Sequence, residues 1–239
     1  MSFEKAGRAL LSLIYPPCCE ACGAAVEHPQ YLCESCAAGA IRIEEPFCEV
    51  CSEPFHGTIS RSFTCANCAD RKFHFTCAAT RYRSTGVVRD LIHRFKYGRE
   101  FRLRHPLARW AAEALEDERM WEPRIDALVP VPLFVARKRY REFNQAAELA
   151  RLVGKRARIP VADCLLRTRN TTSQVASSRR ARMENLRDAF KMRHSADMHD
   201  RHLVLVDDVL TTGSTLDECA RVLLDGGAAS VRAITVARG

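Results

Sequence analysis

The spacing of apolar residues changes near residue 75, and from there it alternates between two periods. In GVVRDLIHRFKYG, apolar side chains recur on one face of a helix that ends at Gly98. The apolar runs Ile125–Leu133 and His202–Val206 predict buried strands. Further strands are expected at 75–83, 161–167 and 231–237, and further helices at 108–115, 144–154 and 214–225. Strands alternating with helices predict an α/β fold, a mostly parallel sheet with helices on both faces.

The first 76 residues lack this periodicity and are rich in cysteine. Ten of the twelve cysteines precede residue 78, and eight of these form four CxxC pairs. The pairs are Cys19 with Cys22, Cys33 with Cys36, Cys48 with Cys51, and Cys65 with Cys68. Two such pairs supply the tetrahedral sulfur shell of one zinc ion. We therefore expect two structural zinc ions in a small double zinc-ribbon domain over residues 1–76, stabilised mainly by metal, and a second domain over residues 77–239.

Other interpretations of the cysteines stay open at this point. A disulfide framework would need an oxidising compartment, for which the sequence carries no secretion signal. A redox role for one CxxC pair explains four copies poorly. Spacing favours zinc sites made by consecutive pairs, although interleaved pairing is also compatible with it. The further candidate ligands Cys18, Cys77, His56 and His74 are left out of the metal sets.

Length and charge narrow the class of protein. The 239 residues contain no apolar run approaching the roughly 18–20 residues of a membrane span. The N-terminus predicts a short amphipathic helix stopped by Pro16 and Pro17, and we expect a cytoplasmic protein. Net charge is +8, but residues 134–194 alone hold 16 Lys and Arg against 5 Asp and Glu. This concentration predicts a polyanionic partner, and a charged, solvated surface is the alternative.

The stretch LVLVDDVLTTGSTL, residues 203–216, combines a strand, an acidic pair and a polar loop. The residues that lead into the next helix are Thr211, Thr212, Gly213, Ser214 and Thr215. Their hydroxyls and the free amides of the helix start can converge on a phosphate. The lysine of GxxxxGK[ST] is missing, which argues against a P-loop nucleoside triphosphatase. Asp207 and Asp208 suit the vicinal hydroxyls of a sugar and Mg²⁺, so the stretch predicts a sugar phosphate as ligand.

This stretch resembles the signature with which type I phosphoribosyltransferases bind 5-phosphoribosyl-1-pyrophosphate (PRPP). Four CxxC pairs before such a domain resemble the ComF/GntX family of competence-protein-F-like proteins. Further matching blocks are FKYG (Phe95–Gly98), VPVPL (Val129–Leu133), RKRYREFNQAAELA (Arg137–Ala150) and Thr172–Phe190, so the resemblance covers nearly the whole chain. The family usually has glycine where this chain has Glu142, and we expect the local backbone to differ there.

The resemblance implies a type I phosphoribosyltransferase fold that binds PRPP together with Mg²⁺. It assigns Asp207 and Asp208 to the ribose and the metal as catalytic residues, and residues 211–215 to the 5′-phosphate. The implied pyrophosphate loop and flexible hood contain Val131, Pro132, Arg137, Arg139, Arg141, Asn144, Gln145, Gln174, Arg182 and Asn185.

Two functions compete on the sequence alone, and whether the chain is an enzyme stays open. In the first, the protein binds PRPP and acts in DNA uptake and natural transformation, alongside other competence proteins at the inner membrane face. Single-stranded DNA would lie on the basic zone, with Tyr140 and Phe143 stacking on bases. In the second, it transfers ribose-5-phosphate from PRPP to a small nitrogenous acceptor, for which no protein nucleophile is required.

Overall fold

The computed structural model describes residues 16–27, 30–55, 57, 59, 63–170, 186–193 and 197–239. The expected N-terminal helix lies outside these residues, as do His56, Gln174, Arg182 and Asn185. Within the described part of the chain, no helix is both long and apolar enough to cross a membrane.

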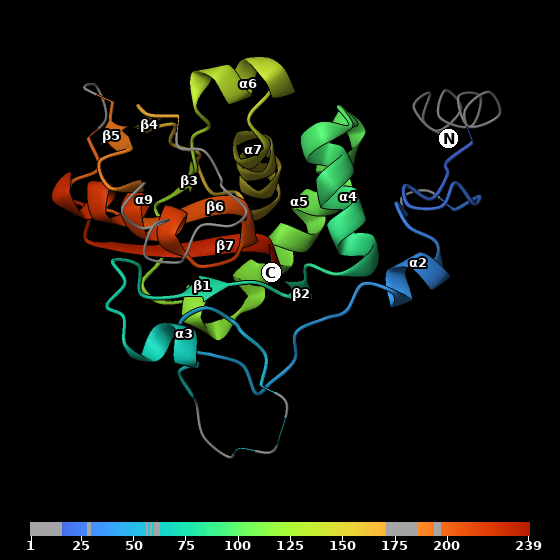
Figure 1. Ribbon diagram of the computed structural model, residues 1–239, viewed down its shortest axis with the longest axis horizontal. Helices are drawn as coiled ribbons and strands as arrows, with labels where there is room; N and C mark the ends of the chain where they lie inside the picture. The colour runs from blue at the N-terminus through green and yellow to red at the C-terminus, as the bar shows by residue number, and fades with distance from the viewer. Residues whose placement is uncertain are drawn as a thin grey trace.

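Five parallel strands form the main sheet, which confirms the predicted α/β class (Figure 1). They are β1 (Ala78–Ala79), β2 (Tyr82–Arg83), β3 (Ala127–Pro130), β6 (His202–Leu210) and β7 (Ser230–Arg238). Strand β7 pairs with β1 and β2 along one edge and with β6 along the other, and β3 lies beyond β6. The single strand expected over residues 75–83 is wrong, because Thr80 and Arg81 separate β1 from β2.

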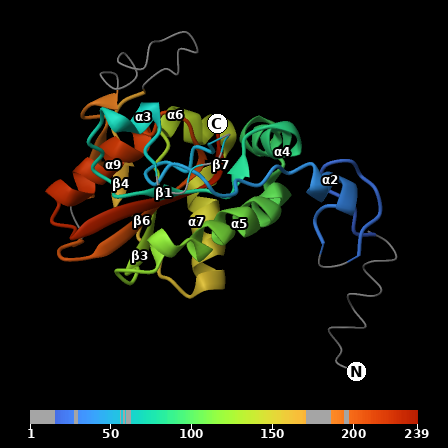
Figure 2. The same ribbon diagram turned by 90° about the horizontal axis from the view of Figure 1, so that it is seen from below.

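Alternating side chains of β6 divide the apolar interior into two layers. Val204 and Val206 point into one layer, whereas Leu203 and Leu205 point into the other. The first layer is covered by α4 (Gly86–Tyr97), α5 (Arg104–Glu113) and α7 (Gln145–Ala157), and the second by α9 (Ser214–Asp225) (Figure 2). Helices therefore cover both faces, as predicted. Short elements complete the fold: α2 (Glu34–Ala38), α3 (Ala66–Ala69), α6 (Val135–Arg141), η1 (Phe101–Leu103), η2 (Ala114–Glu116) and η3 (Glu118–Met120).

Three further predicted strands differ from the structure in their bounds. The strand expected over Ile125–Leu133 is limited to β3, which ends at Pro130. The strand expected at residues 161–167 is reduced to β4 (Leu165–Arg167), which pairs antiparallel with β5 (Phe190–Met192) outside the main sheet. Strand β6 was expected to end at Val206, and it continues through the acidic pair to Leu210. Strand β6 is longer than expected because it stays paired with β7 up to Leu210, which lies opposite Arg238.

The two cysteine-rich segments occupy different environments. The first, with α2, lies at one end of the molecule beside α4 (Figure 1). In the second, Cys48, Cys51 and Cys68 are buried in the same apolar cluster as Leu205 and the other side chains of the α9 layer. The division between residues 76 and 77 stays a prediction.

Candidate functional site

The eight CxxC cysteines form two tetrads of consecutive pairs. Within Cys19, Cys22, Cys33 and Cys36, and within Cys48, Cys51, Cys65 and Cys68, all Sγ atoms lie within 4.8 Å of one another. Zn–S bonds of about 2.3 Å in a tetrahedron separate the sulfurs by about 3.8 Å. The Cys22–Cys33 and Cys51–Cys65 sulfurs are 3.7 and 3.6 Å apart. Both sets therefore fit a structural zinc ion, and the interleaved alternative is wrong.

The acidic pair lies near the carboxyl end of β6 and already has a cationic neighbour. Lys96 Nζ, on α4, lies 2.7 Å from Asp208 Oδ1. The backbone amide of Asp208 donates a hydrogen bond of 2.8 Å to Asp207 Oδ1. Asp208 is buried and Asp207 half-buried. The FKYG block thus supplies a lysine to the acid pair from 111 residues upstream.

The electrostatic state of the pair follows from this arrangement. Burial and the adjacent Asp208 charge raise the pKa of Asp207 to about 7, although Lys96 acts in the opposite direction. Burial alone would lower the pKa of Lys96, but Asp208 and Asp207 raise it above its ordinary value. Near neutral pH the group of three therefore carries a charge between zero and −1, which suits a cation or sugar hydroxyls better than a bare phosphate.

The polar loop after β6 takes the form expected of an anion cradle. Gly213 precedes α9 with φ of 75°, a conformation that favours glycine. Thr212 Oγ1 and Ser214 Oγ are 3.0 Å apart, and the Ser214 amide donates to Thr212 Oγ1 at 3.4 Å. Thr211 and Thr215 flank this pair at the start of the helix. Hydroxyls and the backbone amides of a helix N-terminus are thus collected in one turn.

The VPVPL block begins with the last two residues of β3 and continues into the loop beside β6. The Val131 amide donates to Val206 O at 3.0 Å, and Pro132 is buried with it. The Asn144 side chain donates to Val131 O and accepts from the Ala146 amide, each at 3.1 Å. Gln145 is buried, and its Oε1 accepts from Arg141. Asn144 and Gln145 therefore hold the loop and the start of α7, and their predicted contact with pyrophosphate stays a prediction.

Glu142 has an uncommon backbone conformation, and Phe143 differs from expectation. Glu142, which replaces the family's glycine, has φ of 69°, in the left-handed region that glycine favours. The expected difference in backbone from the family stays a prediction. Phe143 packs between Phe95 and Phe101, each ring centroid 5.0 Å away, and is not available to stack on a base. Tyr140, in contrast, is 67% exposed on α6.

Cations on α4, α6 and β4 act on the acid pair or on its lysine: Lys96 contacts Asp208, the charge of Arg141 acts on Lys96, and that of Arg167 acts on Asp207. Arg137, Arg139 and Arg141 all lie on α6, with Arg139 exposed. Arg167, on β4, has its pKa lowered by burial and by the charge of Arg137, while Asp207 opposes this shift. Sequence reasoning missed Arg167 and also missed Lys96 as a site residue. The position of Lys96 within FKYG, a block that matches the family, was the available signal for the lysine, and no comparable signal marked Arg167.

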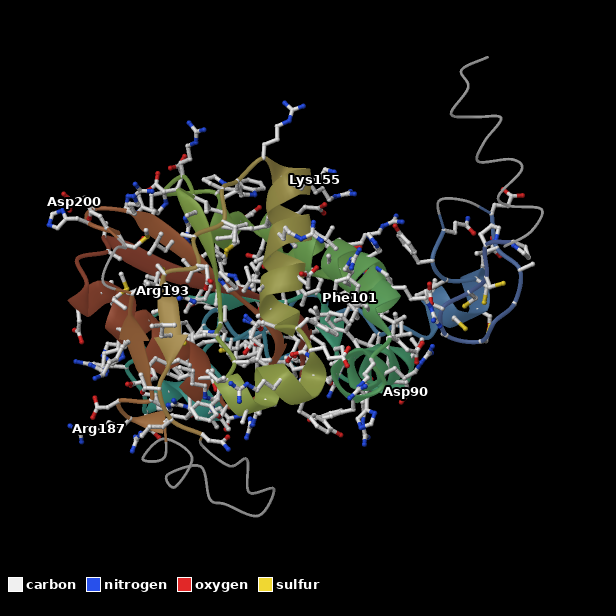
Figure 3. All side chains as sticks on the ribbon, turned by 90° about the horizontal axis from the view of Figure 1, so that it is seen from above. Asp90, Phe101, Lys155, Arg187, Arg193 and Asp200 are labelled. Carbon is white, nitrogen blue, oxygen red and sulfur yellow. The ribbon has the colours of Figure 1, made fainter. Side chains whose placement is uncertain are left out.

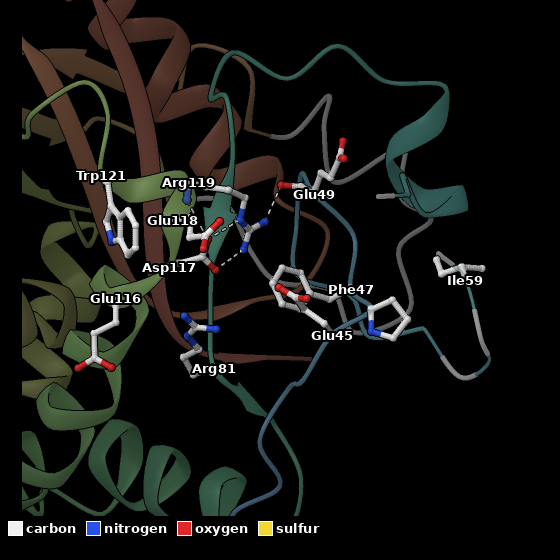
Figure 4. A pocket seen from close by; sticks show the side chains of 11 residues that line it. Glu45, Phe47, Glu49, Ile59, Arg81, Glu116, Asp117, Glu118, Arg119 and Trp121 are labelled. Carbon is white, nitrogen blue, oxygen red and sulfur yellow. Dashed lines mark hydrogen bonds and ion pairs between the residues drawn. The ribbon is translucent and has the colours of Figure 1, made fainter. Parts of the chain in front are cut away.

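The segments that carry the first and second tetrads are called the first and second ribbons. A separate cavity of about 670 Å³ lies between the second ribbon and η3, with Phe47, Arg119 and Trp121 in its lining (Figure 4). Arg232, the third residue of β7, donates to Arg119 O at 3.4 Å. The lining also includes Arg81, between β1 and β2, but neither the acid pair nor residues 211–215. Ligands of open α/β sheets bind beyond the carboxyl ends, where the acid pair and the polar loop are found.

Comparisons with known proteins agree with this architecture. Residues 10–71 match the model of the double zinc ribbon domain, and residues 143–239 match that of the phosphoribosyl transferase domain. The DNA utilization protein YhgH of Escherichia coli is 31% identical over 204 residues, covering 84% of this chain and 87% of that protein.

Two relatives carry competence names. Competence protein F of Haemophilus influenzae is 34% identical over 152 residues, covering 62% of this chain and 66% of that protein. Competence protein ComFC of Bacillus subtilis is 37% identical over 113 residues, covering 46% and 44%. With two zinc-binding tetrads ahead of a phosphoribosyltransferase domain, the chain belongs to the ComF family of competence-protein-F-like proteins.

Proposed function

We propose that this protein binds PRPP with Mg²⁺ at the carboxyl end of β6 and acts in the handling of DNA taken up by the cell. One observation supports PRPP most directly: an acid pair near the end of β6 is followed within a few residues by a helix start rich in hydroxyl groups. Asp207 and Asp208 take the ribose hydroxyls and the metal, and residues 211–215 take the 5′-phosphate. When bound, Mg²⁺ neutralises pyrophosphate charge.

The pyrophosphate end of PRPP faces the cations of α6 and β4 in this proposal. Arg137 and Arg167 lie close enough for each other's charge to matter, and a pyrophosphate group would relieve that repulsion. Arg139, Arg141, Asn144 and Gln145 stand at the same side of the sheet, on or after α6. The hood residues Gln174, Arg182 and Asn185, which lie outside the described part of the chain, are proposed to complete the enclosure and exclude water.

The role in DNA handling is supported by the names of the relatives and by the exposed basic helix α6. The basic zone of residues 134–194 does not form one patch, because Lys155 and Arg187 lie on opposite sides of the molecule (Figure 3). We therefore confine single-stranded DNA to α6, with Lys138 and Arg139 on phosphates and Tyr140 under a base. A cytoplasmic location and contact with other competence proteins at the membrane belong to this proposal.

The alternative is a working phosphoribosyltransferase. The observation that favours it is the pKa of about 7 at Asp207, which suits a general base for an acceptor amine. The amine nitrogen would form a bond to the ribose anomeric carbon while the bond to pyrophosphate breaks.

Two measurements on the zinc-loaded protein distinguish these functions. Pyrophosphate release is followed with PRPP, Mg²⁺ and a pool of bases and amines, and binding of labelled single-stranded DNA is followed at 50 and at about 200 mM salt. Salt-sensitive DNA binding without turnover supports the DNA-handling role, and turnover without DNA binding refutes it. Lys138→Ala with Arg139→Ala should weaken DNA binding, whereas Lys155→Ala with Arg156→Ala, at the far end of α7, is the matched control.

A further inference from the structure

The second zinc tetrad continues directly into a segment that contacts the polar loop. Arg71, three residues after Cys68, donates from Nη1 to Thr212 O at 2.7 Å. Its guanidinium also lies over the ring of Phe73, 4.1 Å from the ring centroid. The Arg71 amide in turn donates to Cys68 O at 3.1 Å, which fixes the start of this segment against the tetrad. A metal ligand is thus linked to the middle of the loop by two hydrogen bonds.

The same segment contacts the turn and the first residues of α9. A methyl group built on Gly213 would lie 3.1 Å from the ring of Phe73 and 3.5 Å from that of Phe75, so the turn rests against both rings. The backbone amide and the ring Nδ1 of His74 lie 2.7 and 2.9 Å from Asp217 Oδ1. Both the turn and the helix start are therefore held by residues 71–75.

A third connection reaches the strand that leads into the loop. Arg238, at the end of β7, is buried and donates to Leu210 O at 3.0 Å. Its other nitrogen lies 2.7 Å from a Glu53 carboxylate oxygen and 3.9 Å from Cys51 Sγ. Arg238 thus links Leu210, the last residue of β6, to Cys51 of the second tetrad and to Glu53, two residues further along the ribbon.

These contacts orient the backbone of the loop. In a trans peptide the carbonyl and the following N–H point in opposite directions. Because Leu210 O and Thr212 O are both held on the ribbon side, the amides of Thr211 and Gly213 point away from the ribbon. An anion cradle needs amides that point to a common side.

The first ribbon makes contacts of a different kind. Its Glu20 carboxylate pairs with Arg102 at 2.6 Å, and its Glu20 carbonyl accepts from Arg94 at 2.7 Å. Tyr31 stacks near His105. Arg94, Arg102 and His105, which the first ribbon contacts, lie on α4, η1 and α5. These elements lie toward the other end of the molecule from α9 (Figures 1 and 2).

We propose that the second zinc ribbon is a positioning element of the phosphate loop, holding residues 210–217 in the conformation that binds PRPP, whereas the first ribbon has no such role. The inference rests on the proposed PRPP site for its functional meaning. Its structural content, the control of loop order by Arg71, His74 and Arg238, can be measured without PRPP.

The test compares full-length, zinc-loaded variants. Arg71→Ala with His74→Ala removes two ribbon-to-loop contacts and keeps both tetrads, and Arg102→Ala removes a ribbon-to-domain ion pair from the first ribbon as the matched control. The readouts are zinc content, hydrogen exchange of amides 211–217, and the Kd of PRPP with Mg²⁺ from calorimetry. We expect two zinc ions in each variant. Loop exchange should be faster and PRPP binding roughly tenfold weaker only in the first variant.

A second pair of variants acts on the metal sites. Cys65→Ser and Cys22→Ser should each leave one zinc ion per chain, and only Cys65→Ser should raise loop exchange and weaken PRPP binding. The inference is overturned if loop exchange is unchanged in both the Arg71/His74 variant and the Cys65 variant. It is also overturned if the Cys65 and Cys22 variants change loop exchange equally. If the wild-type protein fails to bind PRPP, the proposed function fails, and loop exchange alone then decides whether the ribbon positions the loop.

Discussion

Asp207 is expected to destabilise the ligand-free protein at neutral pH. Its pKa is raised from 3.8 to about 7 by burial and by the charge of Asp208. Between these two values the folded protein holds a proton that the unfolded chain has lost, so the free energy of unfolding falls as the pH rises through this window. A shift of about three units corresponds to about 4 kcal/mol, reached in full above pH 7.

Replacing Asp207 by Asn removes this cost and little else. The amide oxygen can still accept the hydrogen bond from the Asp208 amide, now made at 2.8 Å. Compared with the wild type, Asp207→Asn should therefore raise the free energy of unfolding by about 2 kcal/mol at pH 5 and about 4 kcal/mol at pH 8. Binding of PRPP with Mg²⁺ should be lost, because the metal loses a charged oxygen ligand.

Urea unfolding followed by tryptophan fluorescence measures this difference, since both tryptophans, Trp110 and Trp121, follow the cysteine-rich segments and Trp110 is buried in the same apolar cluster as Val204 and Val206 of β6. Asp208→Asn is the matched control. It leaves Lys96 charged beside a neutral side chain, so it should not stabilise the protein. A gain that does not grow with pH, or an equal gain for both variants, would refute the electrostatic reasoning.

Four further outcomes are expected. Arg119→Met should destabilise the protein by about 3–5 kcal/mol in the same urea assay, because buried Asp117 loses its partner at 2.7 Å. Glu142→Gly should stabilise it by about 0.5–1 kcal/mol, since glycine adopts the left-handed conformation more readily; a loss of stability would contradict this. Atomic absorption should find two zinc ions per chain, and chelation should abolish the structure of both ribbons by circular dichroism. The affinity for PRPP with Mg²⁺ should rise by up to tenfold per pH unit below pH 7, as Asp207 loses its proton, when calorimetry is run from pH 6 to 8.

Features encoded within a few adjacent residues were predictable from the sequence. Both ligands of a CxxC knuckle come from one short turn, and the loop of residues 211–215 is contiguous with its helix, so local spacing identified each of them. The parallel sheet followed from strands alternating with helices, because a parallel pair needs a crossover helix.

Features that depend on distant residues were not predictable. The length of β6 is set by its register with β7, whereas the adjacent charges of Asp207 and Asp208 suggested an end. Lys96 faces Asp208 only because α4 packs beside the carboxyl end of β6. Helical periodicity identified the apolar face of α4 but gave no partner for a polar residue on its last turn.

The end of β6 is therefore held from two sides, by a lysine that partly neutralises the acid pair and by arginines that hold the loop backbone. Lys96 on α4 limits the charge of the acid pair but leaves Asp207 with a raised pKa, whereas Arg238 and Arg71 on the ribbon side fix the backbone of the loop. An acid pair kept partly protonated costs stability in the free protein, and a bound divalent cation removes that cost. Such a site persists only where the surrounding structure prevents the strand end from relaxing. The second tetrad, linked to the loop through Arg71 and Arg238, provides that restraint.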